Sequence, residues 1–272
     1  MTSIATNQAA IRVHYHGIHN EKAETHATER LASGKRVINA SDDAAGMFIA
    51  GRMKAQFTGL ERAVLNSYDG VSLVNTAEAN LNEIRNMVLR MREIAVQMAN
   101  GIYVDNPDRD FAQLEIDQLL QQIDLVAENA NFNGVFLLDG TFQGVGIQTG
   151  PSANERPSIF FKDNTASGLD ISNVEVTTQD KAKLAMVTLE TALTSISDEL
   201  SRAGAYDNRF GHTISVLEQT AKTTRVARGR IMDADMASES TRLSKAQVLA
   251  KANTAMLAQA NNSMSRVLAL FN

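Results

Sequence analysis

The chain has 272 residues, no cysteine, no tryptophan, 5% aromatic residues and a formal net charge of −5. Without cysteine it has neither disulfides nor thiolate metal sites. The acidic balance argues against a nucleic-acid-binding protein, and no apolar run approaches the roughly 20 residues that span a bilayer. Abundant small and amide side chains favour long helices over a thick globular core. The N-terminal sequence also lacks the charged-then-apolar order of a cleaved signal peptide.

Apolar residues recur at spacings of three and four from Met53 to Met98, which predicts one long helix with a coiled-coil seam. The seam consists of Met53, Phe57, Leu60, Val64, Val71, Val74, Ala77, Leu81, Ile84, Val88, Met91, Ala95 and Met98. Ser41, Asp42 and Asp43 offer side-chain caps for the start, and Asn100-Gly101 marks the end. Such a helix is about 80 Å long, far beyond the usual length in a globular protein.

Two further seams follow the same spacing. One contains Met186, Leu189, Leu193, Ile196, Leu200, Ala203, Asp207, Phe210, Ile214, Leu217, Ala221 and Thr224. The other contains Leu243, Ala246, Ala250, Asn253, Leu257, Ala260, Met264, Val267 and Phe271. A shorter helix is expected over roughly 108–130. Because no single helix can bury its own stripe, these helices must pack on each other or on another copy.

The middle of the chain differs from both flanks. Asn133-Gly134, Asp139-Gly140 and Gly150-Pro151 are turn signals between short β-prone runs. We therefore expect a mainly α fold, a long antiparallel coiled-coil helical rod with a small β-hairpin region in the middle of the chain. The β/loop region covers 141–179. Since it lies outside every seam, we expect filaments to form even when most of 141–179 is deleted and the gap is closed by a short turn.

The sequence resembles the bacterial flagellins. Residues 29–39 read E-R-L-A-S-G-K-R-V-I-N and are followed by D-D-A-A-G at 42–46, similar to the flagellin pattern E-R-L-S-S-G-x-R-I-N…D-D-A-A-G. Further similar stretches lie at 69–78, 92–97, 132–134, 228–235, 244–247 and 257–261. The resemblance covers roughly 29–140 and 180–272. Two departures are a histidine-rich first helix in place of a leucine-rich one, and a short centre without large outer domains.

The resemblance implies a structural subunit that polymerises into the flagellar filament for swimming motility, without catalysis or a cofactor. It assigns 1–41 and 235–272 to terminal helices of the inner tube, and 42–140 with 180–234 to the surrounding rod. It also implies an extracellular location after passage through the flagellar export apparatus, with help from a flagellin chaperone. A hook–filament junction protein stays open as an alternative, as does a surface adhesin or glycan-binding protein on the same frame.

Two sets of candidate functional residues follow. The C-terminal seam predicts assembly contacts through Leu243, Ala250, Leu257, Met264 and Phe271. The resemblance also suggests recognition by a Toll-like innate receptor through Arg90, Ile94 and Glu115, with solvated helix-surface residues as the competing interpretation.

The first helix gathers four histidines, at positions 14, 16, 19 and 26. A metal site would favour two imidazoles at i and i+4. This spacing is absent, so we interpret the histidines as polar members of a helical packing face.

Overall fold

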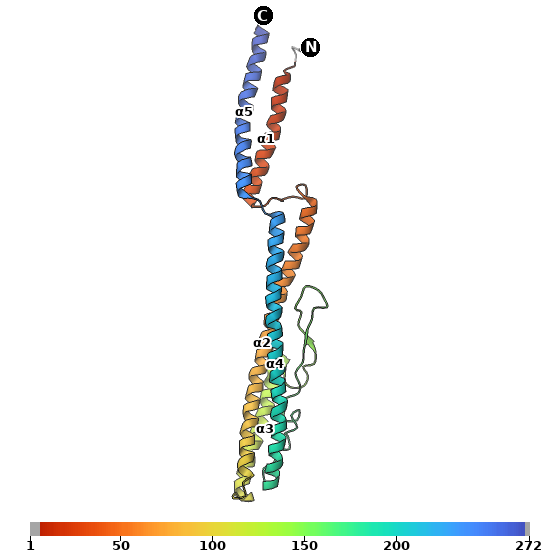
Figure 1. Cartoon of the computed structure of the whole chain (residues 1–272), viewed down its shortest axis with the longest axis vertical. Helices are drawn as coiled ribbons and strands as arrows, with labels where there is room; N and C mark the ends of the chain where they lie inside the picture. Colours follow the sequence, from red (N-terminus) through yellow and green to blue (C-terminus); the bar gives the residue numbers. More distant parts are fainter. Residues whose placement is uncertain (1–5, 270–272) are drawn as a thin grey trace. The chain divides into compact units, whose positions relative to one another are not determined.

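A computed structural model describes residues 6–269, with the side chains of 106 and 267–269 left undescribed. The helices are α1 (Gln8–Ser33), α2 (Ala44–Met98), a π-helical turn η1 (Asp105–Arg109), α3 (Asp110–Asn129), α4 (Gln179–Met232) and α5 (Met236–Ala269). Four two-residue strands are β1 (Asn131–Phe132), β2 (Val135–Phe136), β3 (Val145–Gly146) and β4 (Ser158–Ile159) (Figure 1). The mainly α fold with a small β region is therefore confirmed. In the part of the chain that the structure describes, no helix could cross a membrane.

The chain divides into two compact units. Unit 1 comprises 1–55 and 223–272, and unit 2 comprises 56–222. These limits differ from the rod limits of 42 and 234 expected from the resemblance, because the start of α2 and the end of α4 pack with the terminal segments. Each unit is described separately below.

Unit 2 is built on α2, α3 and α4, which share one continuous apolar core. Contacts between α2 and α4 run in opposite directions along the two helices. Arg92 pairs with Glu190 at 2.9 Å, Gly70 faces the Phe210 ring, and Leu60 packs with Leu217. The two helices are therefore antiparallel, as expected. Every residue of both predicted seams is buried or half-buried, so the three-four spacing identified the packed faces correctly.

The end of α2 depends on one buried arginine that the sequence reasoning missed. The Arg109 guanidinium, only 3% exposed, donates to the carbonyls of Met98 at 3.0 Å, Asn100 at 3.0 Å and Tyr103 at 2.7 Å. It also pairs with Asp105 at 2.5 Å. The last carbonyls of a helix lack partners within the helix. Arg109 supplies those partners and fixes the turn that leads into α3.

The chain after α3 forms two small hairpins. In the first, Asn133 and Gly134 have φ of 50° and 80°, the left-handed values that a two-residue type I′ turn requires between β1 and β2. In the second, β3 pairs antiparallel with β4. The sequence therefore identified the turns well, although regular strand is limited to two residues in each case.

The segment 141–179, which lies outside every predicted seam, takes part in the helical packing. Its apolar side chains are fully or almost fully buried in the core shared with α2, α3 and α4: Phe142, Ile159, Phe161, Ile171 and Val176. The Phe161 ring contacts Phe142 and Tyr206, with centroids 5.9 Å and 6.1 Å away. Heptad spacing on the helices did not show this region, because a loop can complete a core without any periodicity of its own.

A row of α4 side chains holds the β4 segment. The Tyr206 hydroxyl accepts a hydrogen bond from the Phe160 N–H at 3.3 Å, and the Arg202 guanidinium lies 5.8 Å above the Phe160 ring. Glu199, only 1% exposed, lies 3.2 Å from Arg202. Burial raises the pKa of the Glu199 carboxyl, and Arg202 opposes part of that rise. Positions 199, 202 and 206 share one face of the helix.

Unit 1 contains the antiparallel pair of α1 and α5 (Figure 1). The helix α1 ends at Gly34, whose φ of 68° gives the left-handed conformation common at helix ends. Lys35 then forms a β-bridge with Asp233, and the Arg36 N–H donates to the Met232 carbonyl at 2.7 Å. A small apolar cluster of Val37, Ala50, Ile231 and Met232 closes this joint.

Candidate assembly surface

The predicted C-terminal seam is the face by which α5 packs on α1. Between residues 240 and 266, the buried or half-buried positions are Leu243, Ala246, Ala250, Asn253, Leu257, Ala260 and Met264. Phe271, the last predicted assembly residue, lies outside the described residues. The seam therefore has a partner within the chain, and four of the five predicted assembly residues lie on the face toward that partner.

The matching face of α1 is made of small and polar residues. Its covered positions are Asn7, Ala10, Val13, Gly17, Asn20, Glu24, Ala27, Arg30 and Leu31. Among the described residues of α1, only Ala27 is fully buried. Grooves remain between the helices, one of them lined by Gly17, Ala250 and Leu257. Small side chains allow close approach but bury little apolar area, so the α1–α5 contact is weakly stabilised.

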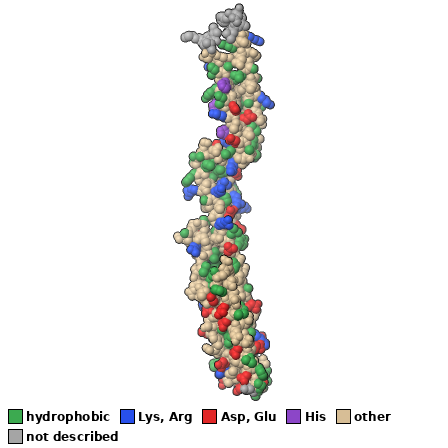
Figure 2. Space-filling view, turned by 180° about the vertical axis from the view of Figure 1, so that it is seen from behind, with side chains coloured by type: hydrophobic (Ala, Val, Ile, Leu, Met, Phe, Trp, Pro, Cys, Tyr) green, Lys and Arg blue, Asp and Glu red, His purple; other side chains and the backbone are tan. Residues whose placement is uncertain are grey.

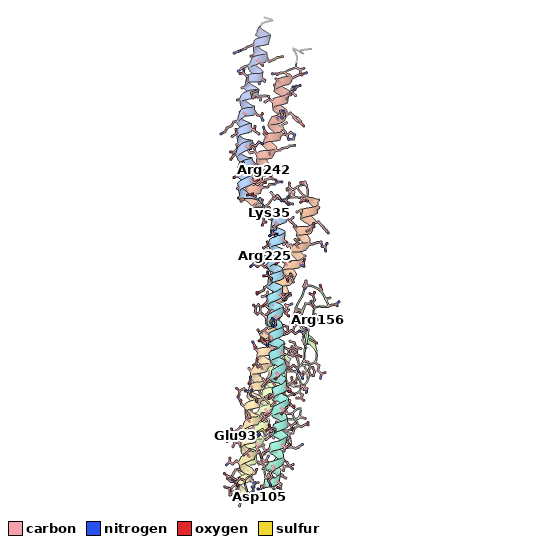
Figure 3. All side chains as sticks on the ribbon, in the orientation of Figure 1. Lys35, Glu93, Asp105, Arg156, Arg225 and Arg242 are labelled. Carbon is pink, nitrogen blue, oxygen red and sulfur yellow. The ribbon has the colours of Figure 1, made fainter. Side chains whose placement is uncertain are left out.

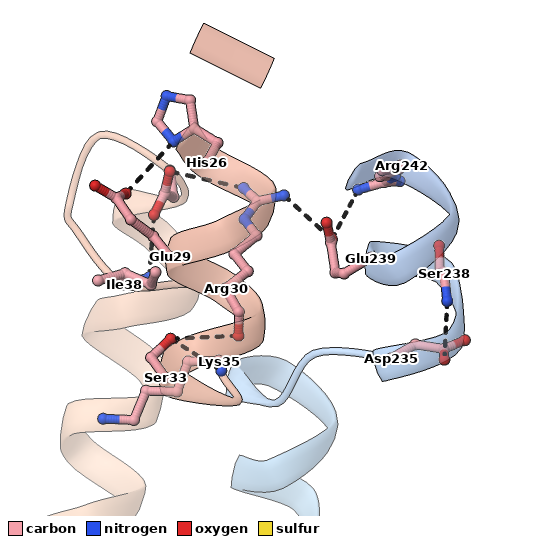
Figure 4. A network of polar contacts seen from close by, with 11 residues as sticks. His26, Glu29, Arg30, Ser33, Lys35, Ile38, Asp235, Ser238, Glu239 and Arg242 are labelled. Carbon is pink, nitrogen blue, oxygen red and sulfur yellow. Dashed lines mark hydrogen bonds and ion pairs between the residues drawn. The ribbon is translucent and has the colours of Figure 1, made fainter. Parts of the chain in front are cut away.

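A polar network joins the two helices at one end of the pair (Figure 4). Glu239 on α5 is 4% exposed and accepts from Arg30 of α1 at 3.5 Å and from Arg242 at 2.9 Å. Arg30 also lies 3.7 Å from Asp42 in the segment before α2. At the other end, the Asn7 amide donates to the Ala260 carbonyl at 3.1 Å. These bonds set the register of the pair.

Two aspartates, Asp43 and Asp235, cap the starts of α2 and α5. Asp43 accepts from the Gly46 N–H at 2.8 Å, as expected for the start of α2. Asp235 accepts from Ala237 and Ser238 at the start of α5. Asp42 instead accepts from the N–H groups of Asn39 and Ile38. These two hydrogen bonds, with a smaller contribution from Arg30, lower the pKa of the Asp42 carboxyl.

Several large apolar side chains of the pair are exposed. Ile11, Tyr15 and Ile18 are 58%, 64% and 42% exposed, and on α5 Val248 and Met256 are 66% and 57% exposed. Residues 11, 15 and 18 form one helical stripe. An isolated soluble helix pair would be expected to bury such a stripe. The pair therefore leaves part of its apolar surface uncovered within the chain.

The four N-terminal histidines are all exposed. Our interpretation of them as members of a packing face is therefore wrong for packing within the chain. His16 and His19 flank Tyr15, with ring centroids 6.3 Å and 5.4 Å from it, and His26 lies 3.9 Å from Glu29. His14 and His26 line the edges of grooves between α1 and α5, although both are exposed.

Of the three residues suggested for receptor recognition, two are exposed and one is buried. Arg90 and Glu115 are exposed and form an ion pair at 2.8 Å between α2 and α3, and Arg90 also contacts Glu93 at 3.2 Å. The bond to Glu115 is the main reason that the pKa of Arg90 is raised. Ile94 is 3% exposed and belongs to the core of unit 2. The structure therefore brings Arg90 and Glu115 together at the surface, without Ile94.

Sequence reasoning missed Glu239, which links three segments of unit 1. A carboxylate one turn before Arg242 at the start of a helix usually indicates a solvated pair. The buried position of Glu239 depends on Arg30, 209 residues away along the chain. No pattern in the C-terminal segment alone indicates that partner.

Comparison with known proteins places these surfaces in a family. Residues 4–143 match the model of the bacterial flagellin N-terminal helical region, and 186–271 match that of the C-terminal helical region. The chain is 35% identical over 258 residues to the flagellar filament 33 kDa core protein of Treponema phagedenis, covering 89% of this chain and 90% of that protein. It is 37% identical over 248 residues to the flagellin of Halalkalibacterium halodurans, covering 90% of each.

Among solved structures, the Bacillus cereus flagellin crystal structure matches with a TM-score of 0.50 and 31% identity. The match covers 56% of this chain and 88% of that chain. Both family regions, the relatives and the long-helix fold agree with the motifs in the sequence. The chain therefore belongs to the bacterial flagellins, the structural subunits of the flagellar filament.

Proposed function

We propose that, within the filament, the terminal segments 1–41 and 235–272 form the inner tube and 42–140 with 180–234 form the layer around it. The observation that carries this proposal is the outward apolar stripe of Ile11, Tyr15 and Ile18 on α1. The covered face of α1 is mostly small and polar by contrast. A pair of this kind gains more stability from contact with other copies than from its own interior.

Electron cryo-microscopy of filaments grown from the purified chain tests this proposal. A polymerising salt should produce filaments in which α1 and α5 lie at the smallest radius. Their outward stripes should then contact α1 and α5 of neighbouring copies. Filaments with α1 and α5 on the outer surface would contradict the arrangement, and failure to polymerise under any condition would contradict the role itself.

The same proposal includes the export route of the chain and its export partners. The chain leaves the cell uncleaved through the flagellar export apparatus, bound beforehand by a flagellin chaperone, and it acts outside the cell as a structural protein without catalysis. The resemblance supports this route, and a chain without cysteine has no thiols to cross-link on the way. In cells that lack the export apparatus, the protein should stay inside with an intact N-terminus. Secretion that continues in such cells would contradict the route.

Recognition by a Toll-like receptor would use Arg90 and Glu115. Both are exposed, and their ion pair presents a fixed polar group on α2 and α3. In reporter cells carrying the receptor, Arg90→Ala should weaken the response to the monomer. Arg209→Ala, an exposed position on α4, is the matched control and should leave the response unchanged. Equal responses from all three proteins would exclude recognition at this site.

A further inference from the structure

Charge is divided unevenly between the two units. Unit 1 contains 14 Lys and Arg against 8 Asp and Glu, a formal net charge of +6. Unit 2 contains 12 Lys and Arg against 23 Asp and Glu, a formal net charge of −11. An even distribution of the total of −5 would leave both units slightly acidic. A flagellin that needed charge only for solubility would not need opposite signs in its two units.

The positive charge of unit 1 gathers around the joint closed by Val37, Ala50 and Met232. We call this set the basic band: Lys35, Arg36, Arg52, Lys54, Arg225, Arg228 and Arg230. Its members come from the segment after α1, the start of α2 and the end of α4; Lys35 and Arg225 are labelled in Figure 3. Arg36 ties these segments together, donating to the Ile231 carbonyl at 2.6 Å. Figure 2 shows Lys and Arg side chains close together on one face.

Most of the basic band is exposed. All of its members except Arg228 are exposed, and Arg228 is half-buried. Three acidic residues lie within the same segments near the joint, Asp42, Asp43 and Asp233. Asp42 lies 3.7 Å from Arg30, and Asp43 lies 3.9 Å from Arg36. Arg52 and Lys54 form no ion pair within the described residues. Arg225 and Arg228 also interact within the chain. Seven cations against three carboxylates still give these segments a net positive charge, and Arg52 and Lys54 are its exposed members at the start of α2.

The negative charge of unit 2 includes a compact group at the turn between α2 and α3. We call Asp105, Asp108 and Asp110 the acidic end; Asp105 is labelled in Figure 3. The one cation in this turn, Arg109, is buried and pairs with Asp105. Asp108 and Asp110 are exposed, and neither forms an ion pair with any residue that the structure describes.

Nearby cations of unit 2 are already used within the chain. Arg90 pairs with Glu115, and Arg92 with Glu190. Lys181 pairs with Glu175, and Lys183 with Asp180 at 3.1 Å. Asp108 and Asp110 are therefore left without a cationic partner among the described residues. A second copy of the chain carries such cations in the basic band.

We propose that the basic band of one copy docks against the acidic end of another copy in the filament. This proposal depends on the proposed function, since it requires polymerisation. The contact joins two different surfaces, which generates an open polymer instead of a closed dimer. Each exposed ion pair contributes little by itself. Several pairs repeat at every subunit, so their combined effect on the critical concentration is measurable, and their main effect is to select the register.

Charge exchange tests the docking directly. One variant carries Arg52→Glu with Lys54→Glu, a second carries Asp108→Lys with Asp110→Lys, and a third combines all four changes. At fixed ionic strength, each double variant should raise the critical concentration about tenfold, because attraction becomes repulsion. The combined variant should return close to the wild-type value, since opposite charges again meet. Sedimentation of seeded filaments measures all three values.

A control variant separates docking from general charge effects. Arg62→Glu with Arg209→Glu makes the same charge change at exposed sites of α2 and α4 outside both surfaces. It should polymerise like the wild type, and circular dichroism should show equal helix content in every variant. Wild-type levels in both double variants would overturn the docking, as would a combined variant worse than either. A wild-type chain that never polymerises would instead contradict the proposed function.

Discussion

Unit 2 and the α1–α5 pair share the same spacing of seam residues along their helices but bury different amounts of apolar surface. In unit 2, Leu81, Ile84, Val88 and Met91 are completely buried, and loop residues complete their core. Between α1 and α5, the covered positions are mostly small or polar, and grooves remain. Unit 2 is therefore stabilised by its own interior. The pair has a defined register but little apolar burial, so it needs neighbouring copies to become stable.

This difference explains why a heptad seam alone does not report stability. Alanine at a seam position keeps the spacing, yet it buries much less area than leucine or phenylalanine. The seam of α2 is rich in large side chains, whereas the seam of α5 alternates Leu243 and Leu257 with alanines. A segment of the second kind can stay loose as a monomer and become ordered in a polymer. The following changes test that contrast.

The largest effect is expected from Leu257→Asp, which should abolish filaments and leave a helical, soluble monomer. Leu257 is half-buried against α1, beside a groove. Loss of its burial costs roughly 3 kcal/mol per subunit and an unpaired carboxylate adds to this. Sedimentation and thermal melting measure the two properties. Leu257→Met is the control and should polymerise. Normal filaments of Leu257→Asp would show that the α5 seam does not contribute to assembly.

A substitution in the core of unit 2 should instead destabilise the monomer. Phe161→Ala should destabilise unit 2 by about 3–5 kcal/mol, because the ring is fully buried against Phe142 and Tyr206. Phe136→Ala removes a ring that is 46% exposed and should cost much less. Chemical denaturation of the two monomers gives the comparison. Equal stability would mean that 141–179 does not complete the core.

Arg109→Met should cause a smaller loss of stability in unit 2. The side chain keeps its length, but the carbonyls of Met98, Asn100 and Tyr103 lose a charged donor. Hydrogen bonds to charged groups contribute about 1.5–3 kcal/mol, so the melting temperature of unit 2 should fall measurably. Arg90→Met breaks only exposed pairs and should cost under about 1 kcal/mol. A larger loss from Arg90→Met than from Arg109→Met would contradict the buried role.

The smallest expected effect is on the pH dependence of the stability of unit 2. The pKa of Glu199 is raised in the folded state, mainly by burial. The stabilisation associated with its protonated form is therefore present below its ordinary pKa and is lost as the pH rises through the raised value. Glu199→Gln should make unit 2 relatively more stable at pH 8 than at pH 4.5, compared with the wild type. Parallel pH profiles of melting temperature for both proteins would exclude this contribution.

The sequence predicted the helices well and their environments less well. Spacing identified the packed faces of α2, α4 and α5, since a helix repeats its faces every 3.6 residues. Turn chemistry identified Asn133-Gly134, because few residues adopt its backbone angles. The partners of Arg109, Glu199 and Glu239 were not predictable, since burial of a charge depends on tertiary contacts. The burial of Phe161 was not predictable either, because the loop that carries it has no periodicity and depends on tertiary contacts.

Hydrogen exchange tests the central contrast most directly, measured on the monomer and on the assembled filament. Amides of α2 and α4 within unit 2 should be protected in both states. Amides of α1 and α5 should exchange quickly in the monomer and become protected by orders of magnitude in the filament. Limited proteolysis of the monomer should likewise trim both ends and leave a resistant fragment near 42–234. Equal protection of α1, α5 and unit 2 in the monomer would contradict the dependence of the terminal pair on neighbouring copies.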